Sequence, residues 1–163
     1  MRDLKHLIYF ESLLENADND LVKQAQAEGK LAIGYTCYHM PEPLLNLPGC
    51  FSVRLRAPRT GSLDIATYYM SNYTCEYARA LVERGMEHFE ILQINDKPNF
   101  FVTHCDIPYK ITDYTLDSYV KQMRRRVLDP LTEKYGVDTS DAAIRQAVKE
   151  HNEVCSIISE IGE

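Results

Sequence analysis

The sequence lacks tryptophan, lacks any C-x-x-C pair and contains no apolar run approaching a membrane span. A transmembrane helix needs about 20 consecutive apolar residues, so we expect no membrane-spanning helix. Residues 1–20 carry acidic side chains throughout and lack the apolar centre of a signal peptide. We therefore expect a cytoplasmic protein.

An excess of positive charge is also missing. The chain has 18 Lys and Arg against 24 Asp and Glu, a formal net charge of -6. A general nucleic-acid binder is disfavoured, because its affinity depends on neutralising phosphates. A content of 45% hydrophobic and 26% charged residues excludes a wholly disordered chain. The length of 163 residues suits one compact domain, and no repeat or Ser/Gly linker divides it.

The number of cysteines is unusual, but their spacing matches no common motif. The five are Cys37, Cys50, Cys75, Cys105 and Cys155. An odd count without close pairs disfavours a disulfide framework, a zinc ribbon and a ferredoxin-type cluster. Spacing alone favours buried, inert thiols, and we place Cys50 and Cys155 in the core. Any metal site would have to gather cysteines from distant loops.

Apolar periodicity predicts strands alternating with helices in the first two thirds of the chain. The predicted helices are 3–15, 19–28 (ended by Gly29) and 75–83 (ended at Gly85), and the predicted strands are 31–35, 50–55, 89–94 and 100–104. This alternation predicts an α/β fold, with a mostly parallel sheet flanked by helices. Ligands collect at the carboxyl ends of such strands, which is where Cys37 and Cys105 fall.

The last third is predicted to be helical. Leu116, Val120, Met123, Val127 and Leu131 recur at the spacing of one apolar helix face. Pro130 either interrupts this helix or, with Asp129 as N-cap, begins a new one. A final helix over 141–161 is predicted to bury one stripe, made of Ile144, Val148, His151, Cys155 and Ile158. We thus divide a single α/β domain, 1–163, into a helical lead (1–30), an α/β core (31–110) and C-terminal helices (111–163).

One stretch carries a family resemblance. GYTCYHMPEPLLNLPGCFSVRLRAP, from Gly34 to Pro58, has a Gly, an aromatic residue and a Cys leading into Pro-Glu, then a Gly and a strand with an Arg. It resembles the opening motif of the 2-hydroxyacyl-CoA dehydratase D-component and benzoyl-CoA reductase family. SNYTCEYARALVERG, CDIPYK at 105–110 and the closing DAAIRQAVKEHNE resemble later family motifs. The likeness covers about 31–160 and matches the N-terminal part of the family.

The resemblance implies a four-iron four-sulfur (4Fe-4S) cluster held by cysteines from two similar domains. An ATP-dependent activator protein would supply one electron, and the resulting ketyl radical would allow a 2-hydroxyacyl-CoA to lose water. Cys37 and Cys75 match the ligand positions, and a helix N-terminus would favour the Cys75 thiolate. The third ligand in the family comes from a second domain, so the resemblance implies completion by a second dehydratase subunit or a missing C-terminal half.

Further residues are candidates for the chemistry around such a cluster. Glu42, in a rigid Pro-Glu-Pro turn, and His39 are candidate proton-transfer groups, although a solvated loop acid explains Glu42 equally well. Arg54 and Arg56 are candidate contacts to the CoA phosphates of an acyl-CoA substrate, or to an acidic partner surface. Cys105 lies beside His104, a pairing that a thiol nucleophile would need, but a packed residue at a strand end is the favoured interpretation. The alternative function is a non-catalytic, cluster-less interaction or small-molecule-binding domain of the same fold.

Overall fold

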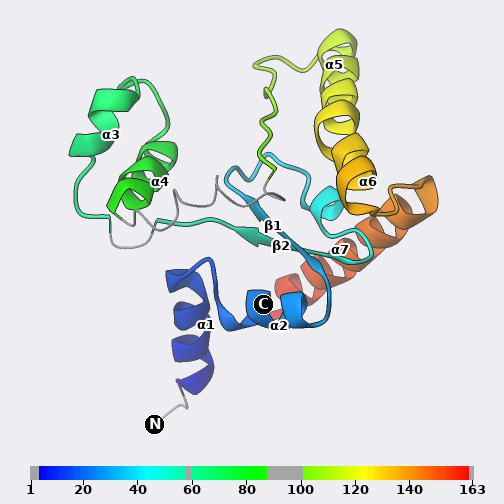
Figure 1. Ribbon diagram of the computed structural model, residues 1–163, viewed down its shortest axis with the longest axis horizontal. Helices are drawn as coiled ribbons and strands as arrows, with labels where there is room; N and C mark the ends of the chain where they lie inside the picture. The colour runs from blue at the N-terminus through cyan, green and yellow to red at the C-terminus, as the bar shows by residue number, and fades with distance from the viewer. Residues whose placement is uncertain (1–3, 58–59, 88–100, 162–163) are drawn as a thin grey trace. The chain divides into compact units, whose positions relative to one another are not determined.

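The computed structural model describes residues 4–57, 60–87 and 101–161. The predicted strand 89–94 lies outside these residues. The elements in chain order are α1 (Lys5–Glu15), α2 (Asp20–Ala27), β1 (Leu31–Tyr35), η1 (Glu42–Leu45), β2 (Cys50–Arg54), α3 (Asp64–Tyr69), α4 (Glu76–Glu87), α5 (Asp113–Met123), η3 (Arg124–Leu128), α6 (Asp129–Tyr135) and α7 (Asp141–Ile161) (Figure 1).

Strands β1 and β2 form a two-stranded parallel sheet. The Leu31 amide donates to the Gly49 carbonyl at 2.8 Å, and the Leu55 amide donates to the Tyr35 carbonyl at 2.8 Å, so both strands advance in the same direction. The predicted α/β class is confirmed. The prediction of a strand over 100–104 is wrong for residues 101–104, which form no strand. The described sheet consists of β1 and β2 alone.

The chain clusters into two compact units, and each unit contains residues of both strands. Unit 1 consists of Met1–Gln24, Gly34–Thr36 and Val53–Val102. Unit 2 consists of Ala25–Ile33, Cys37–Ser52 and Thr103–Glu163. The division into lead, core and C-terminal helices stays a prediction. No helix in the described ranges is both long enough and apolar enough to span a bilayer.

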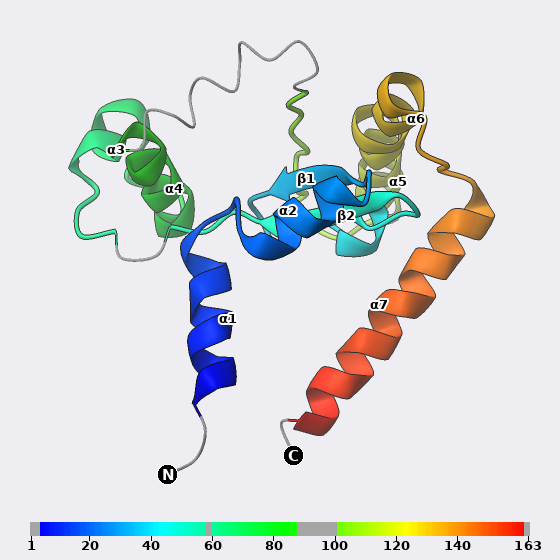
Figure 2. The ribbon, with the colours of Figure 1, turned by 60° about the horizontal axis from the view of Figure 1, so that its bottom comes forward.

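Helices α3 and α4 of unit 1 lie side by side (Figure 2). The Glu83 carboxylate, only 3% exposed, accepts the amides of Ile65 at 3.3 Å and Ala66 at 2.8 Å. It thus caps the N-terminus of α3, a helix that the sequence did not predict. Helix α4 continues past Gly85, where we predicted its end, because Gly85 keeps a helical conformation and supplies no left-handed C-cap.

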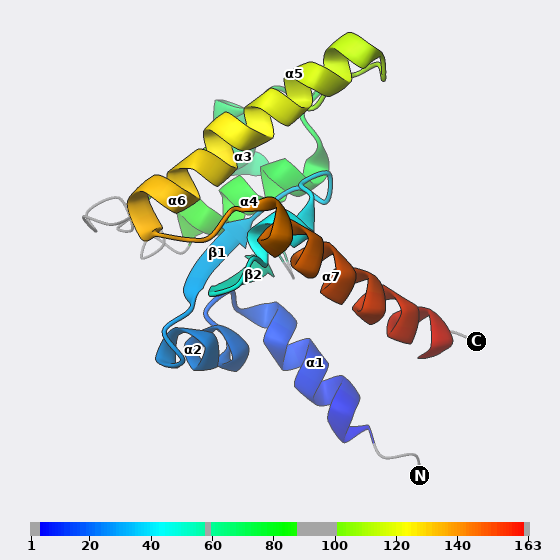
Figure 3. The same cartoon turned by 90° about the vertical axis from the view of Figure 1, so that its right-hand side faces the viewer.

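Helix α5 continues through η3, a single π-helical turn, into α6 (Figure 3). Pro130 is the second residue of α6 and lies in its first turn, and Leu128, at the N-cap position, is itself helical, so Pro130 does not break the helical run. It lacks an amide hydrogen, and the preceding turn widens so that the Asp129 amide donates to the Arg124 carbonyl. Gly136, with φ +68°, ends the run. The apolar face is buried at Met123, Val127, Leu128 and Leu131, whereas Leu116 and Val120 are exposed.

Helix α7 has the bounds that we predicted, but it buries a different face. Its buried residues are Ala143 and Ala147, whose small side chains allow a close approach to η1. The predicted stripe is wrong, because Val148 and Cys155 are exposed and Ile158 is 62% exposed. Cys50 is buried as predicted.

Candidate functional site

Cys37 lies in a tight turn directly after β1. It is half-buried, and its carbonyl accepts the Met40 amide at 3.1 Å, which closes the turn. His39 is exposed within this turn, and its ring lies against the Tyr38 ring with centroids 4.0 Å apart. The thiol of Cys37 and the imidazole of His39 thus share one short loop at the carboxyl end of a strand.

Glu42 is the first residue of η1 and is half-buried. Asn46 anchors this helix, because its side chain accepts the Ser52 amide at 2.9 Å and donates to the Glu42 carbonyl at 3.4 Å. Leu45 and Leu47 are buried, and Leu47 is only 1% exposed. The backbone of Glu42 is therefore held to β2 and to the core of unit 2.

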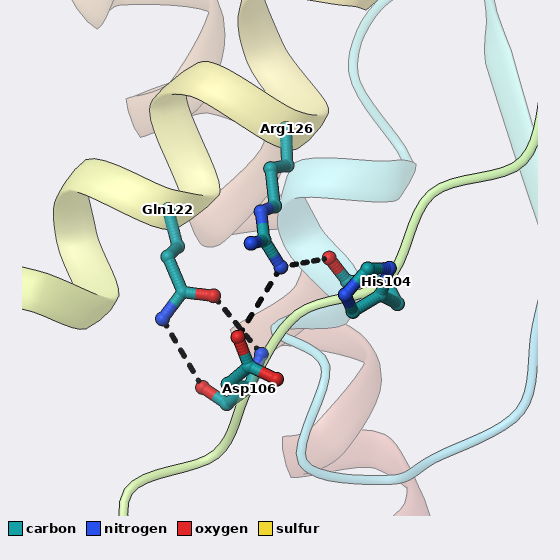
Figure 4. Close-up of polar contacts among 4 residues, drawn as sticks. All are labelled: His104, Asp106, Gln122 and Arg126. Atoms are coloured by element: carbon teal, nitrogen blue, oxygen red, sulfur yellow. Dashed lines mark hydrogen bonds and ion pairs between the residues drawn. The ribbon is translucent and has the colours of Figure 1, made fainter.

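The segment His104–Asp106 is held against the helix formed by α5 and η3 (Figure 4). Gln122 makes a two-point contact with the Asp106 backbone, accepting its amide at 3.0 Å and donating to its carbonyl at 3.5 Å. One Arg126 nitrogen donates to the His104 carbonyl at 2.9 Å and to the Asp106 carboxylate at 3.3 Å. These contacts hold Cys105, the residue between His104 and Asp106, in place.

Tyr119 joins the Cys37 turn to the same helix face. Its hydroxyl donates to the His39 carbonyl at 2.9 Å. The pKa of Tyr119 is raised by burial first, and then by the thiols of Cys105 and Cys37. Burial also raises the pKa of the Cys105 thiol, while the Arg126 guanidinium opposes that shift and the Asp106 carboxylate adds to it. The two cysteines and Tyr119 therefore form one electrostatic neighbourhood in unit 2.

Cys75 and Arg54 belong to unit 1. Cys75 is exposed at the position just before α4, and its carbonyl accepts the Arg79 amide at 3.1 Å, the first bond of that helix. The Arg54 side chain donates to the Thr36 carbonyl at 3.4 Å, and its guanidinium lies 4.9 Å from the centre of the Tyr77 ring. Arg56 is exposed.

Cysteine thiolates are the ligands that iron–sulfur clusters require, so the donor chemistry at Cys37 and Cys75 fits the implied cluster. The described part of the chain nevertheless gathers no group of three or more His, Cys, Asp or Glu side chains that would hold a metal ion.

Three residues of this site were not identified from the sequence. Tyr119, Gln122 and Arg126 were not singled out by the sequence analysis. The neighbouring Arg124 and Arg125 are exposed, whereas Arg126 is half-buried and bonded to the Cys105 segment. The available signal was their spacing of three and four residues, which puts all three on one helix face.

Comparison with known proteins gives one family. The family model described as 2-hydroxyglutaryl-CoA dehydratase, D-component, matches residues 37–163. No curated protein and no solved structure matches the chain.

Proposed function

Because the chain belongs to the 2-hydroxyglutaryl-CoA dehydratase D-component family, we propose that it is an iron–sulfur subunit or domain of an acyl-CoA radical enzyme. The reaction is dehydration of a 2-hydroxyacyl-CoA or reduction of an aryl-CoA, and another chain or domain completes the cluster. The observation that carries this proposal is the family match, which begins at Cys37 itself. An ATP-dependent activator and a second dehydratase subunit are the partners.

Cys37 and Cys75 are the proposed ligands. Cys37 is half-buried in a turn fixed between β1 and η1, which limits its motion before any metal binds. Cys75 is an exposed thiol directly before the first turn of α4, where a metal ion can reach it. When bound, the cluster supplies single electrons to the substrate thioester.

The remaining roles concern the substrate. His39, within the Cys37 turn, and Glu42, the first residue of η1 just after it, are the proposed proton-transfer groups. Arg56 is exposed, and Arg54 presents a planar guanidinium beside the Tyr77 ring. Guanidinium groups pair with phosphate oxygens through two parallel hydrogen bonds, which supports Arg54 and Arg56 as contacts to the phosphates of CoA.

The test is iron and acid-labile sulfide per chain after anaerobic reconstitution in the presence of the second subunit. We expect a brown protein whose iron is lost in Cys37→Ala and Cys75→Ala. Cys155→Ala is the matched control, because Cys155 is an exposed thiol on α7 outside the proposed ligand set. Unchanged iron in Cys37→Ala would refute its assignment as a ligand.

The second candidate function is a cluster-less interaction domain. It is favoured by α1, which has no buried residue and exposes Leu7, Ile8 and Phe10. Large exposed apolar side chains that gather on one element mark contact surfaces. A colourless, iron-free protein that still forms a stable complex with the second subunit would support this candidate over the enzyme.

A further inference from the structure

We propose that His151 and Cys155 on α7 are half of a zinc site, and that the same two residues of a second copy of the chain complete it. Zinc is the divalent ion that a tetrahedral set of thiolate and imidazole ligands suits best. The inference goes beyond the proposed function, because it uses none of the residues assigned there to the cluster or to the substrate.

The first support is the distance between the two donor atoms. Cys155 follows His151 by one helical turn, so both side chains lie on one face of α7. The Cys155 sulfur lies 3.5 Å from His151 Nε2. Zinc binds sulfur at about 2.3 Å and imidazole nitrogen at about 2.0–2.1 Å, and a tetrahedral angle between these bonds separates the donors by about 3.6 Å. The two side chains therefore have the spacing that one zinc ion requires.

The second support is the access that an ion has to this pair. The buried residues of α7 are Ala143 and Ala147, in the part of the helix that packs against η1. Beyond them His151 is half-buried, and Cys155 lies in an exposed stretch that runs from residue 152 to residue 161. An ion can reach both donors, and the side chains of another chain can reach the bound ion.

The third support is the seam on which the pair lies. Val148, His151, Cys155 and Ile158 follow one another at steps of three, four and three residues, which is the spacing of the core positions of a coiled coil. The seam is symmetric about the midpoint between His151 and Cys155. When two copies pair in opposite directions about this midpoint, Val148 of each meets Ile158 of the other. His151 of each then meets Cys155 of the other, and four zinc donors surround the twofold axis.

The distribution of charge on α7 permits this pairing of identical helices. The residues that flank the seam on either side are uncharged: Asn152, Val154, Ser159 and Ile161. Glu153 and Glu160 lie on the side of the helix away from the seam, so the acidic groups of two copies stay apart. The apolar contacts of this short seam are far smaller than the roughly 1,200–2,000 Å² of a stable interface. Association should therefore require zinc.

The binding step balances without a redox partner. Two chains and one Zn²⁺ lose two S–H bonds and form two zinc–sulfur and two zinc–nitrogen bonds, and two protons pass to the buffer. No oxidation state changes. In each chain the ion replaces the hydrogen bond between the thiol and the imidazole.

The test is Zn²⁺ added to the reduced, metal-free full chain, followed by analytical ultracentrifugation and by zinc content after gel filtration. We expect a monomer without zinc, and with zinc a dimer that holds one ion for every two chains. His151→Gln and Cys155→Ser should each stay monomeric and bind zinc more than roughly 100-fold more weakly, since even outer-shell changes cost about 10- to 100-fold. The matched controls are His6→Gln and Cys75→Ser, at an exposed histidine and an exposed cysteine of unit 1, and both should dimerise normally.

Co²⁺ in place of zinc gives a second measurement. A tetrahedral site with two thiolates absorbs strongly in the visible range, whereas hydrated Co²⁺ absorbs weakly, and circular dichroism verifies that each variant is folded. One zinc ion on a monomer, a dimer that persists in Cys155→Ser, or weak cobalt absorption overturns the inference. So does an α7 seam that binds only the second dehydratase subunit and never a second copy. Iron content in the presence of that subunit tests the proposed function separately, because Cys155 belongs to the zinc site alone.

Discussion

Removing the Glu83 carboxylate should destabilise the part of unit 1 that carries Cys75. The carboxylate is 3% exposed and accepts two amides at the start of α3, at 2.8 and 3.3 Å. Glu83→Ala leaves both amides without that acceptor, and an unsatisfied buried donor costs about 1–3 kcal/mol. The 3.3 Å hydrogen bond is long, and neighbouring water can replace part of it. We therefore expect the free energy of unfolding to fall by about 3 kcal/mol in total.

Glu83→Gln separates charge from hydrogen bonding. The amide oxygen of the glutamine can accept one of the two backbone amides, but its NH₂ group then faces the other. The favourable interaction between a negative charge and the helix dipole, about 0.3–1 kcal/mol, is also lost. The loss should therefore be smaller than in Glu83→Ala. Urea unfolding followed by circular dichroism measures the loss, and hydrogen exchange at Ile65 and Ala66 reports whether it is local. Glu133→Ala, at an exposed site in α6, is the control.

The reasoning about Glu83 fails if Glu83→Ala loses less than about 0.5 kcal/mol, the range of ordinary surface substitutions. It also fails if exchange at Ile65 and Ala66 is unchanged, because α3 would then be stable without its remote cap. Equal losses in the Ala and Gln variants would show that charge, rather than the number of acceptors, dominates the effect.

Three further predictions concern titration and thiol reactivity. Since the folded-state pKa of Tyr119 is raised, the free energy of unfolding should fall as pH rises past 10.0. The Tyr119→Phe variant should show a smaller fall over the same pH range, as measured by urea unfolding. Iodoacetamide should label exposed Cys75 well before Cys50, which is 8% exposed and whose pKa is raised by burial; equal labelling rates measured by mass spectrometry would contradict this. The Ser140 amide lowers the pKa of Asp138, so Asp138→Ala should destabilise the chain at neutral pH, with the difference vanishing as pH falls below 3.8.

Elements with strong local signals were predicted well. Helix α7 begins at Asp141 and ends at Ile161 as expected, and β1 occupies the predicted run between Gly29 and the proline-rich stretch. Helix α3 was missed because its cap comes from Glu83, a residue in another helix, and its six residues carry too little periodicity. The burial of α7 was mispredicted because two alanines, rather than the larger apolar residues, face η1.

The candidate site shows a similar division between local and distant signals. Cys37, Glu42 and His39 were singled out as candidates because a motif joins them within six consecutive residues, and their roles stay predictions. Tyr119, Gln122 and Arg126 were not identified, because they contact mainly the backbone of distant segments. Every residue has the same amide and carbonyl groups, so such contacts impose no residue type on the partner segment. Sequence patterns therefore reveal side-chain chemistry but miss the helix face that positions it.

The difference between backbone and side-chain contacts allows the role of the His39 imidazole to be tested. The acceptor for the Tyr119 hydroxyl is the backbone carbonyl of His39, which His39→Ala retains. His39→Ala should therefore leave the Cys37 turn attached to the helix while removing an exposed imidazole from the loop. Hydrogen exchange at the Met40 amide, which closes the turn, should be unchanged in this variant. Tyr119→Phe should do the reverse, keeping the imidazole but releasing the turn at a cost of about 1 kcal/mol. Turnover lost in His39→Ala with unchanged hydrogen exchange at Met40 assigns proton transfer to the imidazole. Exchange at Met40 accelerated equally in both variants would instead make His39 a structural residue of the turn.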